Sequence, residues 1–335
     1  MHVKNAKDGS EFIQSAPDSI LRAALRSGVG MAYECNSGGC GACKFELLQG
    51  DIETLWPQAP GLSERDRQRG RHLACQCRAL SPVTIKAQTG PEYLSGTLPL
   101  RQSAQLLGTR DVTADIREFR FLASEHAQFQ PGQFAMLDLP GLDTSRAYSV
   151  ANTANPQGEW HFQIRRVAQG HGTRILFDSL RPGDTIELDG PYGVAYLRTD
   201  APRDIVCVAG GSGLAPMVSI ARGAAEAGLL ADRKLYFFYG ARTPADVCGE
   251  DMLRTLAGYG QQIQYIPVVS MPGNDGAWQG RTGFVHEVLA TALPSALSEH
   301  EFYFAGPPPM TQALQELLMV EHHVPFGQIH FDRFF

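Results

Sequence analysis

The spacing of apolar and polar residues changes twice along the chain, and each change marks a new kind of structure. In the first region, apolar residues of "PDSILRAALRSG" (17–28) recur at helical spacing, with Asp18 or Ser19 as the N-cap and Gly28 as the stop. The segment "KFELLQGDIETL" (44–55) predicts two strands around a Gln-Gly-Asp turn. These elements predict a small α+β unit that ends near residue 90.

A second region, residues 104–200, consists of short runs in which apolar and polar residues alternate, with Gly and Pro between the runs. Alternation with a period of two predicts strands that bury one face, so we expect an all-β domain, a small barrel. Residues 91–103 carry Gly, Pro and Ser with little periodicity and predict a linker. The runs of the second region are "FAMLDL", "AYSVAN", "WHFQIRRV" and "TIELDG".

In the third region, residues 201–335, apolar runs of strand length alternate with segments of helical periodicity. Such alternation predicts a parallel sheet with helices on both faces, which is an α/β domain. The predicted strands are "DIVCVAG", "KLYFFYG", "QIQYIPVV" and "EFYFAGP", and the predicted helices are "APMVSIARGAAEAG", "GFVHEVLATAL" and "PPMTQALQELLMVEH".

Composition and charge narrow the class of protein. With 335 residues, of which 43% are hydrophobic and 19% charged, the chain is long enough for two or three globular domains. Its net charge of −6 disfavours nucleic-acid binding, which requires a basic face. No apolar run is long enough to span a membrane, and "MHVKNAKDGSEF" lacks the apolar core of a secretory signal. We therefore expect a cytoplasmic protein whose thiols stay reduced.

Three of the seven cysteines stand close together in "YECNSGGCGACKFE". Cys35, Cys40 and Cys43 have C-x₄-C-x₂-C spacing, and in a reducing compartment such a cluster indicates metal binding or redox chemistry, not disulfides. Thiolates suit zinc or iron–sulfur clusters, but zinc ribbons use C-x₂-C pairs and the sequence has no second pair of that kind. The spacing matches plant-type ferredoxins, which hold a [2Fe–2S] cluster with a distant fourth cysteine.

Glycines support this interpretation, because Gly38, Gly39 and Gly41 allow backbone conformations that a Cβ would forbid and let N–H groups approach the sulfurs. The fourth ligand must come from "RHLACQCRALSPVTIKA", which offers Cys75 and Cys77. In plant-type ferredoxins a Leu-Ala-Cys or Leu-Thr-Cys triplet precedes a short stretch and a final strand. Resemblance to that pattern favours Cys75, with "VTIKA" as the strand and Cys77 as a small buried residue.

A glycine-rich turn, "VAGGSGLAP", lies between a predicted strand and a predicted helix. Gly211, Ser212 and Gly213 would let backbone N–H groups reach a pyrophosphate at the helix N-terminus. Pro216 stands where G-x-G-x-x-G has its third glycine, which disfavours a strict Rossmann dehydrogenase. On this motif alone, a tight turn without a ligand is an equal alternative.

The segment "RAYSVAN" offers side chains that suit a flavin. The Arg146 guanidinium can donate two hydrogen bonds to a pyrophosphate. The Tyr148 ring can stack on the isoalloxazine, and Ser149 can reach the polar edge of the flavin. Alone, the motif also fits an ordinary strand with one exposed Arg. Downstream, "GHGT" (170–173) opens a short predicted helix whose N-terminus would hold the pyrophosphate. The turn "DGPYG" (189–193) either lines the flavin or nucleotide crevice or has no role beyond the turn.

These motifs, taken together and in this order, are similar to the ferredoxin–NADP reductase superfamily. More narrowly, nearly the whole chain resembles the iron–sulfur flavoprotein reductases of bacterial multicomponent oxygenases, in particular the reductase components of toluene monooxygenases. The segments that carry the resemblance are "YECNSGGCGACK", "WPQAPGL", "LACQC", "RAYSVAN", "LDGPYG", "AGGSGLAPMVS", "AGPPPM" and "IHFDRFF".

The resemblance implies an N-terminal plant-type [2Fe–2S] ferredoxin domain of β-grasp fold (1–90), a linker (91–103), an FAD-binding β-barrel (104–200) and an NAD(H)-binding α/β domain (201–335). Electrons would pass from NADH through FAD and the cluster to a Rieske-type ferredoxin or a diiron hydroxylase. NADH gives two electrons at once and the cluster accepts one at a time, so a flavin stands between them and no general acid or base is needed.

The resemblance also implies which residues lie at each cofactor. The cluster ligands are Cys35, Cys40, Cys43 and Cys75. The FAD contacts are Arg146, Ala147, Tyr148, Ser149, Ile164, Arg165, Gly170, Gly172 and Thr173. The NAD contacts are Gly211, Ser212, Gly213, Pro216, Tyr239, Arg242, Gly306, Pro307 and Pro308.

Two features near the C-terminus modify this set. Relatives often have a cysteine before Gly-Pro-Pro, close to the nicotinamide, and "FAGPPPM" has Ala305 at that position. A terminal aromatic side chain often covers the flavin in relatives. Phe334 or Phe335 of "DRFF" would either stack there or pack into the core of the α/β domain.

The loop "YGARTPADVCGED" predicts a preference for NADH over NADPH. The 2′-phosphate of NADPH requires a cluster of cations, and the loop offers Arg242 against Asp246, Glu250 and Asp251. These carboxylates would repel a phosphate, and one of them would accept hydrogen bonds from the ribose hydroxyls.

Several other functions share part of this pattern. The nearest are reductases of ring-hydroxylating dioxygenases, phenol hydroxylases or methane-type monooxygenases, and the ending "IHFDRFF" favours toluene monooxygenases over them. A biosynthetic reductase, for example of deoxysugars, would keep the electron transfer. A non-catalytic redox sensor would use the cluster alone, and the flavin and nucleotide motifs disfavour it.

Overall fold

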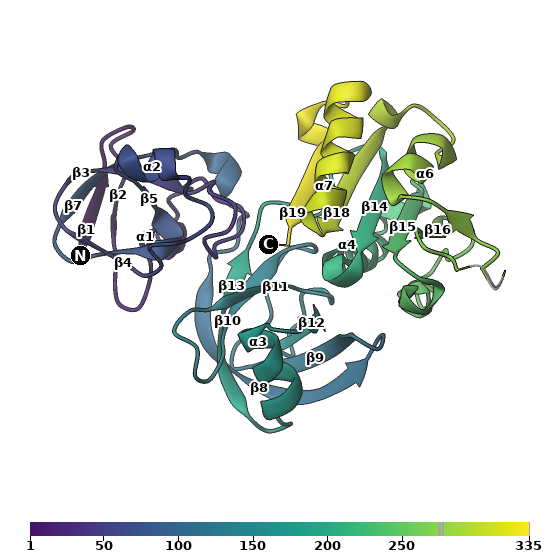
Figure 1. The fold of residues 1–335 in the computed structure, drawn as a ribbon, viewed down its shortest axis with the longest axis horizontal. Helices are drawn as coiled ribbons and strands as arrows, with labels where there is room; N and C mark the ends of the chain where they lie inside the picture. Colours follow the sequence, from purple (N-terminus) through teal and green to yellow (C-terminus); the bar gives the residue numbers. More distant parts are fainter. Residues whose placement is uncertain (274–275, 277, 335) are drawn as a thin grey trace.

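The computed structural model describes residues 1–273, 276 and 278–334. The chain forms three units, each around its own main sheet (Figure 1). The N-terminal unit, in purple and blue, lies at the left of Figure 1, the all-β unit lies below the centre, and the C-terminal unit, in green and yellow, lies at the right. The chain's C-terminus lies between the N-terminal and C-terminal units.

The N-terminal unit is a five-stranded sheet, in the order β2-β1-β7-β3-β5, with one main helix against it. β1 and β7 are parallel and the other neighbours are antiparallel, which gives the predicted β-grasp arrangement. Of the two predicted caps, the helix uses Ser19, whose hydroxyl accepts the Arg22 N–H. The elements are β1 (His2–Asn5), β2 (Glu11–Ile13), α1 (Ile20–Arg26), β3 (Lys44–Gln49), β5 (Arg71–Leu73) and β7 (Val83–Ala87).

The two strands predicted around the Gln-Gly-Asp turn form, but they do not pair with each other. Both edges of β3 are occupied, by β7 and β5. β4 (Ile52–Thr54) therefore pairs with β6 (Cys77–Ala79) in a separate two-stranded sheet. Between β4 and β5 lies the short helix α2 (Glu64–Gln68), whose N-terminus is closed by a capping box from Ser63 and Asp66.

The all-β unit is an antiparallel six-stranded sheet in the order β11-β10-β13-β8-β9-β12. A β-bridge between Val150 and Phe162 joins its two edges and closes the barrel. The first strand begins at Leu100, inside the predicted linker 91–103, because residues 100–105 pair with β13. The elements are β8 (Leu100–Asp111), β9 (Ile116–Ala123), β10 (Phe134–Asp138), β11 (Arg146–Ser149), β12 (Glu159–Arg165), α3 (His171–Arg174) and β13 (Thr185–Tyr192).

The C-terminal unit is a parallel sheet in the order β17-β16-β15-β14-β18-β19, as the alternation of strands and helices predicts. Leu214 and Met252, from α4 and α5, pack on one face, and Leu289 and Leu314, from α6 and α7, pack on the other. The strands are β14 (Asp204–Gly210), β15 (Leu235–Ala241), β16 (Ile263–Val269), β17 (Arg281–Thr282), β18 (His300–Gly306) and β19 (Ile329–Arg333), and the helices are α4 (Leu214–Glu226), α5 (Glu250–Leu253), α6 (Val285–Ala292) and α7 (Pro308–Gln315).

Among the described residues, every helix is too short or too polar to cross a lipid bilayer.

Candidate functional site

The four cysteines named from the sequence lie together in the N-terminal unit, as two pairs. The thiols of Cys35 and Cys40 interact with each other, and so do those of Cys43 and Cys75. Cys43 and Cys75 are buried, whereas the other two are partly exposed. Within residues 1–273, 276 and 278–334, no three His, Cys, Asp or Glu side chains converge on a point suited to a single ion. Two thiolate pairs fit a binuclear [2Fe–2S] cluster better than one zinc ion.

The loop that carries the first pair is shaped around its sulfurs. Three backbone N–H groups point at the sulfurs of Cys35 and Cys40, each at 3.4 Å from the sulfur. The loop reaches this shape through positive φ angles at Gly38 (90°) and Gly41 (77°). Hydrogen bonding from the Cys40 side chain, helped by the N–H of Ser37, lowers the pKa of Cys35 to about 5. The N–H groups of Ser37 and Cys40 at the Cys35 sulfur stabilise its thiolate form, which is the form that binds iron.

Cys77, the other candidate for fourth ligand, points elsewhere. It lies in β6, opposite Thr54 of β4, and its sulfur is 3.8 Å from the Thr54 hydroxyl. Burial raises its pKa to about 12. Cys75 lies instead in a short 3₁₀ turn (Ala74–Gln76), where its sulfur interacts with that of Cys43.

In the barrel, two motifs that are distant in sequence meet. Arg146 and Tyr148 extend from β11, and the start of α3 lies against them. A Cβ on Gly172 would lie 3.3 Å from Arg146 Cγ and 3.4 Å from Tyr148 Oη. No side chain caps α3 at Gly170, so its first N–H groups are available to a ligand. The guanidinium and the helix N–H groups can donate to a pyrophosphate, and the aromatic ring can stack on an isoalloxazine. Together these groups fit a flavin nucleotide.

The remaining residues expected at FAD lie at different places. Ala147 is half-buried and Ser149 is buried on β11, and Thr173 is buried in α3, where its hydroxyl accepts the Val167 N–H. The Ile164 side chain belongs to the barrel core at 2% exposure, so a contact of this residue with FAD would be made by its backbone, and the expectation stays a prediction.

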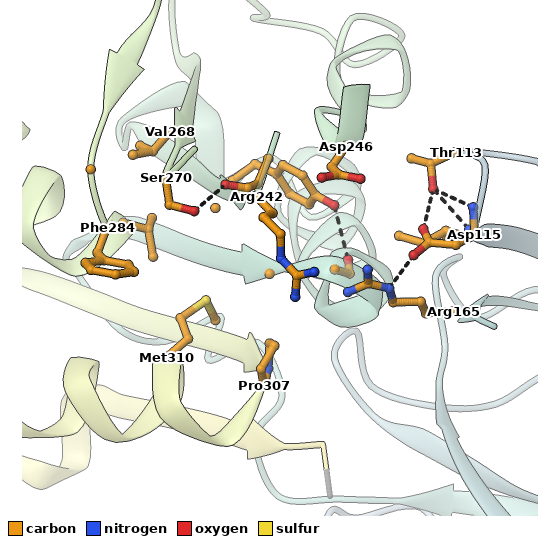
Figure 2. A pocket seen from close by; sticks show the side chains of 18 residues that line it. Thr113, Asp115, Arg165, Arg242, Asp246, Val268, Ser270, Phe284, Pro307 and Met310 are labelled. Atoms are coloured by element: carbon orange, nitrogen blue, oxygen red, sulfur yellow. Dashed lines mark hydrogen bonds and ion pairs between the residues drawn. The ribbon is translucent and has the colours of Figure 1, made fainter. Parts of the chain in front are cut away.

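Arg165, also expected at FAD, reaches a cavity between the barrel and the C-terminal unit (Figure 2). Its Nε donates to Asp115 Oδ2 at 2.6 Å, which fixes the guanidinium at the barrel wall. Figure 2 shows Arg242 extending into the same space from the other side, beside Asp246. Four of the residues predicted for NAD line this cavity, namely Gly211, Tyr239, Arg242 and Pro307. The cavity lies at the carboxyl ends of β14, β15 and β18, where nucleotides bind in open α/β sheets.

Glycine is required at the floor of this cavity. A Cβ on Gly213 would lie 2.0 Å from the Ala305 carbonyl oxygen, and one on Gly306 would lie 2.9 Å from the Gly210 oxygen. The turn after β14 and the end of β18 therefore touch, backbone to backbone. The other predicted NAD residues support the cavity without lining it: Ser212 and Gly213 lie in the 3₁₀ turn Gly211–Gly213, Pro216 in α4, Gly306 at the end of β18 and Pro308 at the start of α7.

Sequence reasoning missed Asp115, Thr113, Phe284 and Met310, which also line the cavity. Asp115 and Thr113 belong to the turn between β8 and β9, which carries no recognisable motif. Phe284 precedes α6 and is 61% exposed at the rim. A pattern of apolar spacing does not distinguish such an aromatic residue from a core residue.

Three family models match consecutive parts of the chain. They are described as a 2Fe-2S iron-sulfur cluster binding domain (residues 5–80), an oxidoreductase FAD-binding domain (103–196) and an oxidoreductase NAD-binding domain (207–316). The ferredoxin–NAD(P)⁺ reductase CarAd of Metapseudomonas resinovorans is 42% identical over 329 residues, which cover 95% of this chain and 94% of that protein.

The chain belongs to the iron–sulfur flavoprotein reductases. This reductase therefore binds a [2Fe–2S] cluster, FAD and NAD. It is also 39% identical to the ferredoxin–NAD⁺ reductase component of the alkene monooxygenase system of Xanthobacter autotrophicus, with 98% of each chain covered. The solved structure of the ferredoxin reductase in carbazole 1,9a-dioxygenase matches with a TM-score of 0.91 and 37% identity, covering all of this chain and 98% of that one.

The carboxylates expected to reject NADPH have different surroundings in the reductase. Asp246 lines the cavity, and its Oδ2 accepts hydrogen bonds from the N–H and hydroxyl of Thr243 at 2.9 and 2.8 Å. Glu250 binds Arg254 and Tyr259 instead, and Asp251 lies 3.4 Å from Arg110. Of the three carboxylates, Asp246 lines the cavity and is the one placed to accept hydrogen bonds from a ribose, whereas Glu250 and Asp251 do not line it.

We expect the reductase to prefer NADH to NADPH by at least about tenfold in kcat/KM, the factor that a missing charged hydrogen bond produces. Asp246→Asn keeps the shape of the side chain and removes its charge, so it should raise kcat/KM for NADPH and reduce this ratio. The measurement is the initial rate with each nucleotide and ferricyanide as acceptor. Glu250→Gln, outside the cavity, should leave the ratio at its native value, and a native ratio in Asp246→Asn would refute this role.

Phe334, one of the two aromatic residues expected near the flavin, lies beside the floor of the cavity. Its N–H donates to the Gly306 carbonyl oxygen at 3.1 Å, and its ring is half-buried against the core of the C-terminal unit. Phe335 lies outside the described residues.

If Phe334 also covers the flavin, Phe334→Ala should retain FAD and alter the rate of flavin reduction or the KM for NADH. Rapid mixing with NADH, followed by flavin absorbance, measures both. If Phe334→Ala reduces its flavin at the native rate and with the native dependence on NADH, the Phe334 ring packs in the core and does not cover the flavin.

Proposed function

We propose that this reductase oxidises NADH and delivers the electrons singly to a ferredoxin or hydroxylase of a multicomponent oxygenase. The observation that carries the proposal is that one chain combines two thiol pairs with a cavity between a flavin-type barrel and an α/β unit. The two relatives named as ferredoxin reductases favour a ferredoxin as the immediate acceptor, and we propose that this ferredoxin is of the Rieske type. A diiron hydroxylase that accepts electrons directly is the other candidate partner.

In this proposal each pair of thiols binds one iron of the cluster. Cys35 and Cys40, which are partly exposed, would hold one iron, and Cys43 and Cys75, which are buried, would hold the other. The backbone N–H groups at 3.4 Å from Cys35 and Cys40 stabilise negative charge on the outer pair and so tune the reduction potential.

The chain's own groups position the nucleotides. Arg146 and the N–H groups at the start of α3 bind the FAD pyrophosphate, and Tyr148 stacks on the flavin. Gly211 and Pro307 form the wall against which the NADH backbone lies, and Arg242 and Asp246 contact its adenosine end. When bound, FAD accepts one hydride, which carries two electrons, and releases the electrons one at a time. The protein supplies distance and orientation, and no side chain has to transfer a proton.

For the oxygenase, we propose a toluene-type monooxygenase that acts on aromatic hydrocarbons. The motifs of the chain, with "IHFDRFF" at its end, support this assignment. Reductase components of monooxygenases and of dioxygenases are both among the relatives. The similarity to a carbazole dioxygenase reductase makes the reductase of a ring-hydroxylating dioxygenase the second candidate, ahead of phenol hydroxylase.

NADH oxidation by the holoenzyme with three acceptors tests the proposal. We expect rapid reduction of ferricyanide, of a purified Rieske ferredoxin from a toluene monooxygenase, and through it turnover of toluene by the diiron hydroxylase. Faster reduction of a carbazole-dioxygenase ferredoxin than of the toluene-monooxygenase ferredoxin would favour the second candidate. Reduction of ferricyanide alone would contradict delivery to a ferredoxin.

A further inference from the structure

The segment "DGPYG" (189–193), expected as a turn, is mostly strand: residues 189–192 belong to β13, where Asp189 and Gly190 pair with β8. The segment does not line the cavity between the barrel and the C-terminal unit, and its contacts lead to the N-terminal unit. We propose that residues 189–193 of the barrel and Arg333 of the C-terminal unit form a docking surface, which holds segment 33–35 of the N-terminal unit in place. Electrons then enter the cluster on the side of Cys35. This inference rests on the proposed electron transfer from flavin to cluster.

The first part of the docking surface is a buried carboxylate. Asp189 is fully buried within β13, and its Oδ2 accepts a hydrogen bond from Arg26 of α1 at 2.7 Å. Arg22, also of α1, lies 3.5 Å from the same oxygen and donates to the Ser145 hydroxyl at 3.1 Å. Ser145 is next to Arg146 of the flavin motif, so α1 reaches the edge of the flavin site. Arg101 of β8 lies 3.4 Å from this oxygen as well, so Asp189 would keep part of the compensation for its buried charge if Arg22 and Arg26 were lost, and would lose the part that comes from the N-terminal unit.

The second part is Tyr33, two residues before Cys35. Its hydroxyl oxygen accepts the Gly193 N–H at 2.7 Å, and its ring meets that of Tyr192 edge-on, with centroids 6.4 Å apart. Both partners belong to segment 189–193, at the end of β13. Tyr33 itself is 6% exposed, so this contact is buried away from solvent.

The third part comes from the other unit. Arg333, the last residue of β19, donates from Nε to Glu34 Oε1 at 2.9 Å and from Nη2 to Oε2 at 2.7 Å. Such two-point pairing fixes orientation as well as distance. Figure 1 shows the end of β19 between the N-terminal and C-terminal units.

Three consecutive residues therefore have three different partners. The barrel holds Tyr33, the C-terminal unit holds Glu34, and Cys35 is a proposed ligand of the outer iron. Arg333 of the C-terminal unit interacts electrostatically with Cys35 and Cys40, so the outer pair is the one on the side of the other units. The docking surface thus fixes the distance between flavin and cluster, on which the rate of electron transfer depends, and does not act on hydride transfer.

The test is anaerobic stopped-flow mixing of the holoenzyme with NADH, which resolves flavin bleaching from cluster reduction. For Glu34→Gln we expect flavin reduction at the native rate and flavin-to-cluster transfer at least about threefold slower. For the double variant Arg26→Gln with Glu34→Gln we expect flavin-to-cluster transfer to be about tenfold slower, because each change removes a hydrogen bond between charged groups of different units. Rates are taken per cluster, counted from the EPR signal after dithionite reduction.

Two comparisons separate docking from general damage. Glu46→Gln removes an ion pair within the N-terminal unit, with Lys86 at 3.8 Å, and should leave both rates native. The charge-swapped pair Glu34→Arg with Arg333→Glu should recover part of the rate lost in Glu34→Gln.

Native flavin-to-cluster rates in Glu34→Gln and in the double variant would overturn the docking role. If the double variant does not fold, the rates of Glu34→Gln and of Glu34→Arg with Arg333→Glu are sufficient to test the docking role. A native holoenzyme whose cluster NADH does not reduce at all would overturn the proposed function instead, so the two failures are distinguishable.

Discussion

Cys75→Ser is expected to abolish the visible absorption and the EPR signal of the [2Fe–2S] cluster. The Cys75 thiol is buried and directed at Cys43, so no solvent ligand can replace it without rearrangement of the turn. A serine hydroxyl is a harder ligand than thiolate and much less acidic, and it holds iron poorly in a thiolate site. The measurement is iron content and the EPR spectrum after dithionite reduction.

The matched control is Cys77→Ser, two residues along the chain. The Cys77 sulfur faces Thr54, and a hydroxyl there can bond to the Thr54 hydroxyl, so we expect a native cluster content and spectrum. Both variants should keep FAD and NADH–ferricyanide activity, since those sites lie in the other two units. A native cluster in Cys75→Ser, or its loss in Cys77→Ser alone, would show that the ligand assignment is wrong.

Arg146→Ala is expected to yield protein that loses most of its FAD on purification. Arg146 is the charged residue of β11 whose Cγ lies against the start of α3, and a hydrogen bond from a charged group contributes about 1.5–3 kcal/mol. We therefore expect the Kd for FAD to rise about tenfold or more, measured by titration of the apoprotein with FAD. Arg146→Lys should recover part of the affinity, because it restores the charge without the fork.

Arg120→Ala serves as the control for this change. Arg120 lies on β9 of the same barrel and pairs with Glu159 at the surface, at 3.0 Å. Its removal should leave the Kd for FAD at the native value. The cluster spectrum should be native in both variants, and an unchanged Kd for FAD in Arg146→Ala would remove Arg146 from the flavin site.

The sequence predicts best where the chemistry is local. Cys35, Cys40 and Cys43 are close in sequence, and the loop that joins them uses positive φ angles at Gly38 and Gly41, as their glycines indicate. The turn after β14 is another local feature, whose glycines are required by contact with the end of β18. Strands and helices of the C-terminal unit follow from apolar runs of clear length.

Prediction fails where a residue's role depends on a partner distant in sequence. Nothing in the sequence near β4 indicates that its partner is β6, because that choice follows from the occupied edges of β3. Glu250 and Asp251 lie in the loop expected to hold the ribose, yet they face Arg254 and Arg110. The role of Asp189 depends on arginines of another unit. Such contacts leave no periodic signal along the chain.

The most direct test of the account is anaerobic reduction of the reductase by NADH, with and without FAD. The account predicts that in the holoenzyme the flavin bleaches first and the cluster's EPR signal appears afterwards. It also predicts that FAD-free protein, with its cluster intact and reducible by dithionite, gives no such signal with NADH. Reduction of the cluster by NADH at the same rate in the absence of FAD would contradict the account.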